Sequence, residues 1–210
     1  MGSLIENTCF VLSNVALASL CIADTWTVDD DGKADFNNIQ DAIDAALDGD
    51  EILVYPGTYT DTGDNVVDMM GKSLWLHSSD GPETTIIDGA SSNTAVIFEG
   101  GEGATAILDG FTIRNGNGGI LCSGNSSPVI SNNYIMENTG INGGGIYISA
   151  RTENGENNPL VVDNMIINNN VFGTGWSGKG GGVYLYGYGT VIISGNTISD
   201  NMGSSGGGIG

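Results

Sequence analysis

The sequence predicts an all-β protein, a single-stranded parallel β-helix or solenoid with one N-terminal capping helix. A run of glycines before an alternating strand returns three times, as NGGGIYIS (142–149), KGGGVYLY (179–186) and SGGGIG (205–210). Pairs of asparagines recur at matching positions, and a single segment has helical spacing. A repeat of this length without helices is typical of stacked coils of strand, in which each coil contacts only its neighbours.

The composition fits such a protein and excludes several kinds of partner. The 210 residues include 35 glycines but only 4 prolines, which indicates many tight turns and not a collagen-like repeat. The 25 acidic and 5 basic residues give a net charge of −20. This charge repels phosphate, so we expect no nucleic-acid partner. The same charge disfavours binding to anionic membranes. It also disfavours binding to polyanionic polysaccharides, unless metal ions bridge the charges.

Residues 1–23 are predicted to be a signal peptide or apolar leader, and residues 24–210 the β-helix domain. The segment 9–23 is apolar, has small residues near its end and is too short for a comfortable membrane span. The first eight residues lack Lys and Arg, so an apolar segment that covers one end of the fold is the alternative. Export would place the protein outside the cell, at the cell surface or in the periplasm. No membrane insertion of the mature domain is expected.

Residues 36–47 are predicted to form the capping helix, with Asp35 as its N-cap and Gly49 as its stop. The apolar residues on one face of this helix are Phe36, Ile39, Ala42, Ile43, Ala46 and Leu47. An amphipathic helix beside a stack of strands can cover the open end of the hydrophobic core. A short strand follows at 51–60 and is closed by the turn residues at 56–57.

The segment DDDG (29–32) partly matches a calcium-binding loop. Thr27 stands where the first Asp ligand of such a loop is required. We therefore expect a surface turn here, and no metal site or cofactor in the chain.

The later part of the chain aligns with itself in two ways. On the glycine blocks, the residues that correspond are Ile120, Ile146, Val183 and Ile209, with steps of 26, 37 and 26 by subtraction. On the asparagines, the residues that correspond are Asn133, Asn164 and Asn196, each followed five positions later by Asn138, Asn169 and Asn201. Coils that stack about 4.8 Å apart would bring these side chains together in ladders. A β-sandwich or propeller would not require such an alignment.

Several segments together resemble right-handed parallel β-helix proteins of the pectin lyase-like superfamily. They are ADFNNIQDAIDAALDGDEILVYPGTYT, GPETTIIDGA, GFTIRNG and the coils of the form N-x-I-x-x-N…GGGI. The resemblance covers about residues 25–210 and implies a right-handed solenoid. It implies no single activity, because the superfamily includes lyases, hydrolases, esterases, epimerases, adhesins and copper-associated periplasmic proteins.

No catalytic residue can be assigned by this resemblance. Lyases of the superfamily need a basic residue, and the candidates are Lys33, Lys72, His77, Arg114, Arg151 and Lys179. Each is more easily explained as a surface charge or a structural residue. Hydrolases need two carboxylates on one groove, and no such pair is evident in the coil strands. Cys122 aligns with Ile148 and Leu185, so it should point inward as a small apolar residue and not serve as a nucleophile.

Aromatic residues are the candidate binding site. Strand alternation directs Val183 and Leu185 inward and the intervening tyrosines outward. The candidate carbohydrate-binding residues are Tyr147, Tyr184, Tyr186, Tyr188 and Trp176, because flat aromatic rings can stack on sugars. The alternative is that tyrosine simply favours strand surfaces.

The function favoured by these observations is non-catalytic polysaccharide binding or adhesion by an exported or cell-surface β-helix. The alternative is an extracellular carbohydrate-active enzyme, a polysaccharide lyase or glycoside hydrolase, whose site is incomplete in this sequence. A structural spacer is a third possibility. Because the sequence stops inside a glycine block, we expect further coils of the same chain after Gly210.

Overall fold

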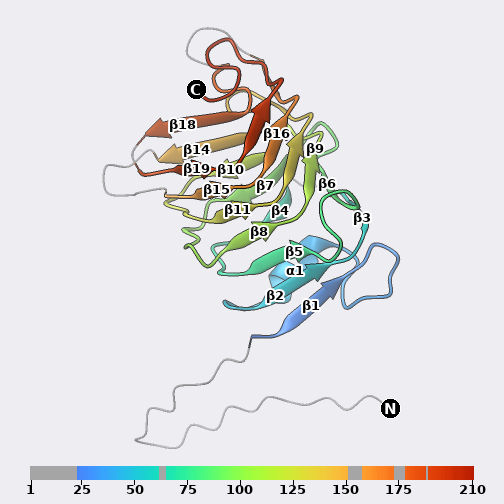
Figure 1. The fold of residues 1–210 in the computed structure, drawn as a ribbon. Helices are drawn as coiled ribbons and strands as arrows, with labels where there is room; N and C mark the ends of the chain where they lie inside the picture. The colour runs from blue at the N-terminus through green and yellow to red at the C-terminus, as the bar shows by residue number, and fades with distance from the viewer. Residues whose placement is uncertain (1–22, 62–64, 151–157, 173–177, 188) are drawn as a thin grey trace, which may run out of the picture.

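The computed structural model describes residues 23–61, 65–150, 158–172, 178–187 and 189–210. Within them the chain winds into stacked coils, and each strand pairs in parallel with its counterpart in the next coil (Figure 1). The colours of Figure 1 run from blue to red along the stack, so neighbours in space are successive coils of the sequence. This arrangement confirms the predicted parallel β-helix.

Three sheets form the walls of the coil. The first contains β1 (Thr25–Val28), β2 (Glu51–Val54), β5 (Trp75–Ser78), β8 (Ile107–Asp109), β11 (Val129–Ser131), β15 (Leu160–Val162) and β19 (Ile192–Ser194). The second contains β3 (Gly57–Tyr59), β6 (Thr85–Asp88), β9 (Thr112–Arg114), β12 (Tyr134–Met136), β16 (Met165–Ile167) and β20 (Thr197–Ser199). The third contains β4 (Asn65–Asp68), β7 (Thr94–Phe98), β10 (Ile120–Cys122), β14 (Ile146–Ala150) and β18 (Val183–Gly187). A short pair, β13 (Thr139–Gly140) and β17 (Asn170–Val171), lies between the second and third sheets in the chain.

The register of the third sheet matches the predicted alignment of the glycine blocks. Ile120 pairs with Ile146, Ile146 pairs with Val183, and Val183 bridges to Ile209. The first three side chains are buried in one continuous core. Cys122 is also buried there, opposite Ile148, and burial raises the pKa of its thiol far above the usual range. The prediction that it points inward is confirmed.

Two ladders of asparagine lie at the corners of the coil. In one, Oδ1 of Asn164 accepts hydrogen bonds from the backbone N (2.9 Å) and Nδ2 (3.1 Å) of Asn133. Asn164 in turn donates from both nitrogens to Oδ1 of Asn196. The second ladder repeats the pattern and consists of Asn138, Asn169 and Asn201. Buried backbone groups at the corners therefore receive partners from the next coil.

The left-handed backbone at these corners belongs to the residue before each ladder asparagine. Asn132 and Asp163 have φ of 54° and 55° ahead of Asn133 and Asn164. Glu137 and Asn168 have φ of 58° and 55° ahead of the second ladder. The ladder asparagines thus serve by hydrogen bonding, and their neighbours supply the unusual conformation that the sharp corner requires.

The repeated glycine block is needed because coils approach closely at this corner. A Cβ at Gly145 would lie 2.6 Å from the carbonyl oxygen of Gly182 in the next coil. At Gly143 the tight turn itself is the reason, since φ is +56° and a Cβ would lie 2.4 Å from the carbonyl oxygen of Ile146 in the same coil. No side chain fits at either separation, so glycine recurs once per coil.

The single helix among the described residues, α1 (Ile39–Ala45), is shorter than predicted. Its N-cap is Asn38, whose Oδ1 accepts from the backbone N of Asp41 at 2.8 Å. The prediction of Asp35 as N-cap is wrong, because Asp35 instead accepts from the backbone N and Oγ1 of Thr27. The helix ends at Ala45, so Leu47 does not lie on its apolar face and is 63% exposed.

The helix caps the N-terminal end of the stack, as predicted. Ile39, Ala42 and Ile43 are buried in the core. The side-chain amide of Gln40 accepts from the backbone N of Asp68 at 2.8 Å and donates to its carbonyl oxygen at 3.2 Å. Gln40 thus supplies hydrogen bonds to the first strand of the third sheet, whose edge would otherwise lack a partner.

The segment DDDG forms a surface turn, in which the backbone N of Gly32 donates to the carbonyl oxygen of Asp29 (3.3 Å). Asp30 accepts from the backbone N of Thr58 at 3.1 Å, and Asp31 pairs with Lys33. No group of three or more His, Cys, Asp or Glu side chains in the described part of the chain is arranged to hold a metal ion. No helix among those residues is both long and apolar enough to cross a bilayer.

Candidate functional site

Two rows of outward side chains cross the third sheet. The first row, running from β7 to β18, contains Ile97, Leu121, Tyr147 and Tyr184. The second row lies two positions further along the same coils and contains Glu99, Ser123, Ser149 and Tyr186. The inward residues between the rows belong to the core, so these rows form the outer surface of the sheet.

Tyr147 and Tyr184 lie side by side on β14 and β18, as the sequence predicts. Their ring centroids are 5.4 Å apart and the ring planes differ by 17°, so the two rings stack. Tyr186 follows Tyr184 with a centroid separation of 6.4 Å and a tilt of 33°. Tyr188 and Trp176, the other two predicted site residues, lie outside the described residues.

Tyr184 is not the exposed platform that the alternation predicts. Its side chain is only 7% exposed, while that of Tyr186 is 51% exposed. Tyr147 occupies one side of the Tyr184 ring, and Nζ of Lys179 lies 5.9 Å from the ring centroid. Rings on adjacent parallel strands are close enough to cover one another, so outward direction does not ensure an accessible face.

A pocket of about 380 Å³ lies on the other side of Tyr147, toward β10 and β7. Its described lining residues are Glu99, Leu121, Ser123, Gly124, Asn125, Tyr147 and Ser149. Leu121 and Tyr147 come from the first row, while Glu99, Ser123 and Ser149 come from the second. Three successive coils therefore build one concave surface with both apolar and polar parts.

The loop after β10 forms one wall of this pocket. Gly124 has φ of +61°, and a Cβ there would lie 2.0 Å from the carbonyl oxygen of Glu99. Asn125 continues the left-handed conformation with φ of 68°. The backbone N of Ser126 closes the turn by donating to the carbonyl oxygen of Ser123 at 3.0 Å. The wall thus has a defined shape that depends on glycine at position 124.

Glu102 holds this loop in place. Its carboxylate is 1% exposed and accepts hydrogen bonds from the backbone N of Gly71 (2.8 Å) and Gly100 (3.1 Å) and from Oγ of Ser126. A buried carboxylate is tolerated only when hydrogen bonds of this kind satisfy it. Glu102 therefore joins the corners of three coils behind the pocket, and we regard it as a positioning residue.

Glu99 carries the one ionisable carboxylate among the described lining residues. It is exposed, and its Oε1 accepts a hydrogen bond from Oγ of Ser123 at 2.8 Å. No motif or residue type in the sequence points to Glu99, Ser123 or Ser149 as site residues. Their common position, one residue beyond the inward Phe98, Cys122 and Ile148, is the signal that could have found them.

The candidate basic residues for lyase chemistry that the structure describes each have their own surroundings and do not meet at one site. Lys33 pairs with Asp31, and Nε of Arg114 donates to Asp88 at 2.9 Å. Lys72 donates to the carbonyl oxygens of Ile43, Asp44 and Ala46 at the end of α1. Arg151 lies outside the described residues, and Lys179 lies over Tyr184.

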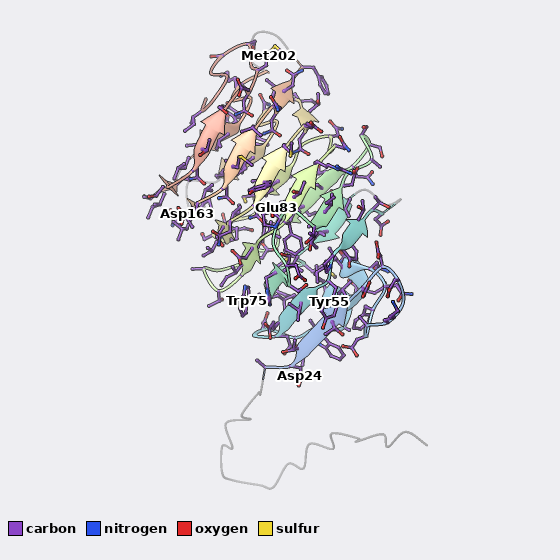
Figure 2. All side chains as sticks on the ribbon, turned by 45° about the vertical axis from the view of Figure 1, so that its right-hand side comes forward. Asp24, Tyr55, Trp75, Glu83, Asp163 and Met202 are labelled. Carbon is purple, nitrogen blue, oxygen red and sulfur yellow. The ribbon has the colours of Figure 1, made fainter. Side chains whose placement is uncertain are left out.

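His77 belongs to a separate cluster on the first sheet. Its Nε2 lies 2.7 Å from Oε1 of Glu51, and its ring stacks on Trp75 with a centroid separation of 4.0 Å. Figure 2 labels Trp75, whose side chain extends to the outside of the ribbon and is 43% exposed. Hydrogen bonds from Thr25 and His77 lower the pKa of Glu51, which keeps this carboxylate ionised.

In the part of the chain that the structure describes, every carboxyl group with a resolved pKa shift has its pKa lowered, and these groups are Asp31, Asp35, Asp50, Glu51 and Asp88. At Asp88, burial alone would raise the pKa, but hydrogen bonds from Ala90, Asn115 and Arg114 outweigh it. A glycosidase needs one carboxylic acid with a raised pKa as its proton donor. These five groups are in environments of the opposite kind.

Comparison with known proteins supports the fold and adds nothing on activity. No curated protein matches the sequence. The family described as "Right handed beta helix region" matches residues 51–210, which include all the coils after the capping helix. The parallel sheets and the asparagine ladders are observed over the same residues. The chain therefore belongs to the right-handed β-helix family.

Proposed function

We propose that this protein is an exported or cell-surface β-helix domain that binds polysaccharide, without catalysis, at the pocket beside Tyr147. The observation that carries the proposal is the position of this ring. Tyr147 stacks on Tyr184 on one side and borders a pocket of about 380 Å³ on the other. A sugar ring placed in that pocket would continue the stack.

The chemistry of the pocket suits a sugar. The apolar face of a pyranose can pack on Tyr147 and Leu121, while hydroxyl groups can bond to oxygen atoms of the polar row. Tyr184 would act indirectly, by supporting the ring of Tyr147, since it is only 7% exposed. Tyr186, which is 51% exposed, extends the aromatic surface toward the next coil.

Catalysis is the weaker alternative. The pocket has one carboxylate, that of Glu99, among its described lining residues, whereas glycoside hydrolysis uses two. The described lining also has no Lys, Arg or His that could take a proton in a lyase reaction.

Export is proposed from the leader at residues 1–23, and N-terminal sequencing of the protein recovered outside the cell would test it.

The binding proposal is tested by titrating the full chain with neutral polysaccharide fragments in a calorimeter. We expect Tyr147→Ala to weaken binding about tenfold or more, because the stacking surface is lost. Tyr134→Ala is the matched control, since Tyr134 is a half-buried outward tyrosine on β12 of the second sheet. Equal loss in both variants, or no binding by the parent protein, would reject the proposal. Release of sugar fragments would favour the enzyme instead.

A further inference from the structure

We infer that the pocket beside Tyr147 selects sugars that carry a protonated amine, the hexosamines, over uronic acids. The inference rests on the proposed function, because it names the class of sugar that the same pocket would take. Its physical basis is the placement of one carboxylate opposite one aromatic ring in a pocket whose described lining has no basic side chain.

Glu99 and Tyr147 stand on opposite sides of the pocket. Glu99 directly follows β7, and Tyr147 lies on β14, with β10 between them. Two strand spacings separate these coils, which is roughly 9–10 Å. Leu121 and Ser123 from the intervening coil line the pocket between them. A sugar ring stacked on Tyr147 would therefore direct its far substituent toward Glu99.

The carboxylate of Glu99 is oriented by one hydrogen bond, and its second oxygen can still accept one from a ligand. Ser123 donates to Oε1 at 2.8 Å, which orients the group, and Oε2 accepts no hydrogen bond from the described residues. The side chain is exposed, so a ligand can reach it. An ammonium group bound there forms a charge-assisted hydrogen bond, whereas the carboxylate of a uronic acid would meet a like charge.

The rest of the molecule reinforces this preference. The net charge of −20 attracts cations and repels polyuronates over a longer range. Among the described basic side chains, Lys33, Lys72 and Arg114 are engaged by their own partners. Lys179 lies over the ring of Tyr184 and is not one of the described lining residues of the pocket. A partly exposed ion pair has modest strength, so we expect a preference of about five- to tenfold for an amino sugar over its N-acetylated form.

The test compares three oligosaccharides of equal length in a titration calorimeter at pH 6 with the full chain. They are a glucosamine oligomer with its amines protonated, its N-acetylated counterpart, and a galacturonic acid oligomer. We expect affinity to fall in that order. Glu99→Gln should remove most of the preference for the glucosamine oligomer and leave only the weaker part that the net charge contributes, while the N-acetylated one binds as before.

Glu83→Gln is the matched control, because it removes the same charge from an exposed position between β5 and β6 (Figure 2). This variant should leave the preference for the glucosamine oligomer unchanged. If the preference came only from the overall negative charge of the protein, both variants would reduce it equally. An equal or stronger affinity for galacturonate, or no effect of Glu99→Gln, would overturn the inference. Binding of the N-acetylated oligomer that depends on Tyr147 would still support the proposed function. Binding of none of the three would reject the inference, and the proposed function would then be decided by the titration with other neutral fragments.

Discussion

At the scale of single residues, Asn164 shows how one side chain serves several coils. Its Oδ1 accepts from both nitrogens of Asn133, and its Nδ2 donates to the carbonyl oxygen of Ile130 at 2.9 Å. Asn164 is 2% exposed and Asn133 is fully buried, so these two side chains cannot replace their hydrogen bonds with bonds to water. Each ladder asparagine thus connects successive coils by hydrogen bonds, in addition to its place at a corner.

Replacing Asn164 with Ala should lower the free energy of unfolding by about 2–4 kcal/mol. The substitution leaves buried backbone groups of its neighbours without partners, and such groups cost about 1–3 kcal/mol each. Urea unfolding followed by circular dichroism measures the change. Asn117→Ala is the control, because Asn117 is exposed and should stay within about 0.5 kcal/mol of the parent. Similar effects for the two variants would contradict a role for the ladder.

Thr85 presents the opposite case, because its buried Oγ1 has no hydrogen-bond partner among the described residues. Thr85→Val should therefore raise the free energy of unfolding by about 0.5–1 kcal/mol, since it removes an unsatisfied polar group and keeps the shape. Thr112→Val is the comparison, because Oγ1 of Thr112 donates to the carbonyl oxygen of Pro82. That variant should be destabilised by about 1 kcal/mol, and the opposite ranking would show the hydroxyl of Thr85 to be satisfied.

Asp88 should make stability depend on pH in the acid range. Burial opposes its ionisation, but hydrogen bonds from Ala90, Asn115 and Arg114 lower its pKa below the ordinary 3.8. A lowered pKa in the folded state contributes stability above the unfolded pKa, and this contribution is lost as the pH falls through the folded value. Thermal unfolding between about pH 5 and pH 2 should show a smaller acid-induced decrease for Asp88→Asn than for the parent. An unchanged profile, relative to an Asp200→Asn control, would contradict this.

At the scale of elements, helix α1 is held by contacts that its own sequence does not reveal. It has only seven residues, too few for a stable isolated helix. Asn38 caps its first turn, and Gln40 pairs with the backbone of β4. Lys72, which comes shortly after β4, closes its C-terminal end through three carbonyl oxygens.

Lys72→Met should loosen this end of the helix and destabilise the protein by about 1–2 kcal/mol. The change keeps the aliphatic stem of a half-buried side chain but removes the cation that satisfies the last carbonyl groups. Hydrogen exchange of the α1 amides should become faster in this variant. Lys33→Met removes an equal charge from an exposed turn and should leave both stability and exchange as in the parent protein. Unchanged exchange in Lys72→Met would mean that packing alone holds the helix.

At the scale of the whole molecule, the coils must approach along their entire length for the core to be continuous. Gly145 allows this at one corner, since a Cβ there would lie 2.6 Å from a carbonyl oxygen of the next coil. Gly145→Ala should destabilise the protein by about 2–4 kcal/mol, because backbone and not a flexible side chain stands in the way. Gly103→Ala is the control, since a Cβ at that position would have its nearest neighbour 3.9 Å away. Comparable unfolding midpoints would show that the coils can separate at low cost.

The sequence by itself determined the coil, its register and its corners. The repeat pattern alone aligns Ile120, Ile146 and Val183, because a solenoid places equivalent residues of successive repeats in contact. It could not determine the N-cap of α1, since Asp35 and Asn38 are both suitable capping residues and the contact with Thr27 decides between them.

Only the tertiary structure decided which outward residues form the site. Tyr184 alternates as predicted, yet the neighbouring side chains cover it, and accessibility depends on those neighbours and not on the strand pattern. The pocket joins Glu99, Ser123 and Tyr147 from three coils, with a wall that Glu102 fixes from behind. A repeat pattern fixes where backbones lie, whereas a pocket depends on the sizes and contacts of individual side chains, which differ from coil to coil.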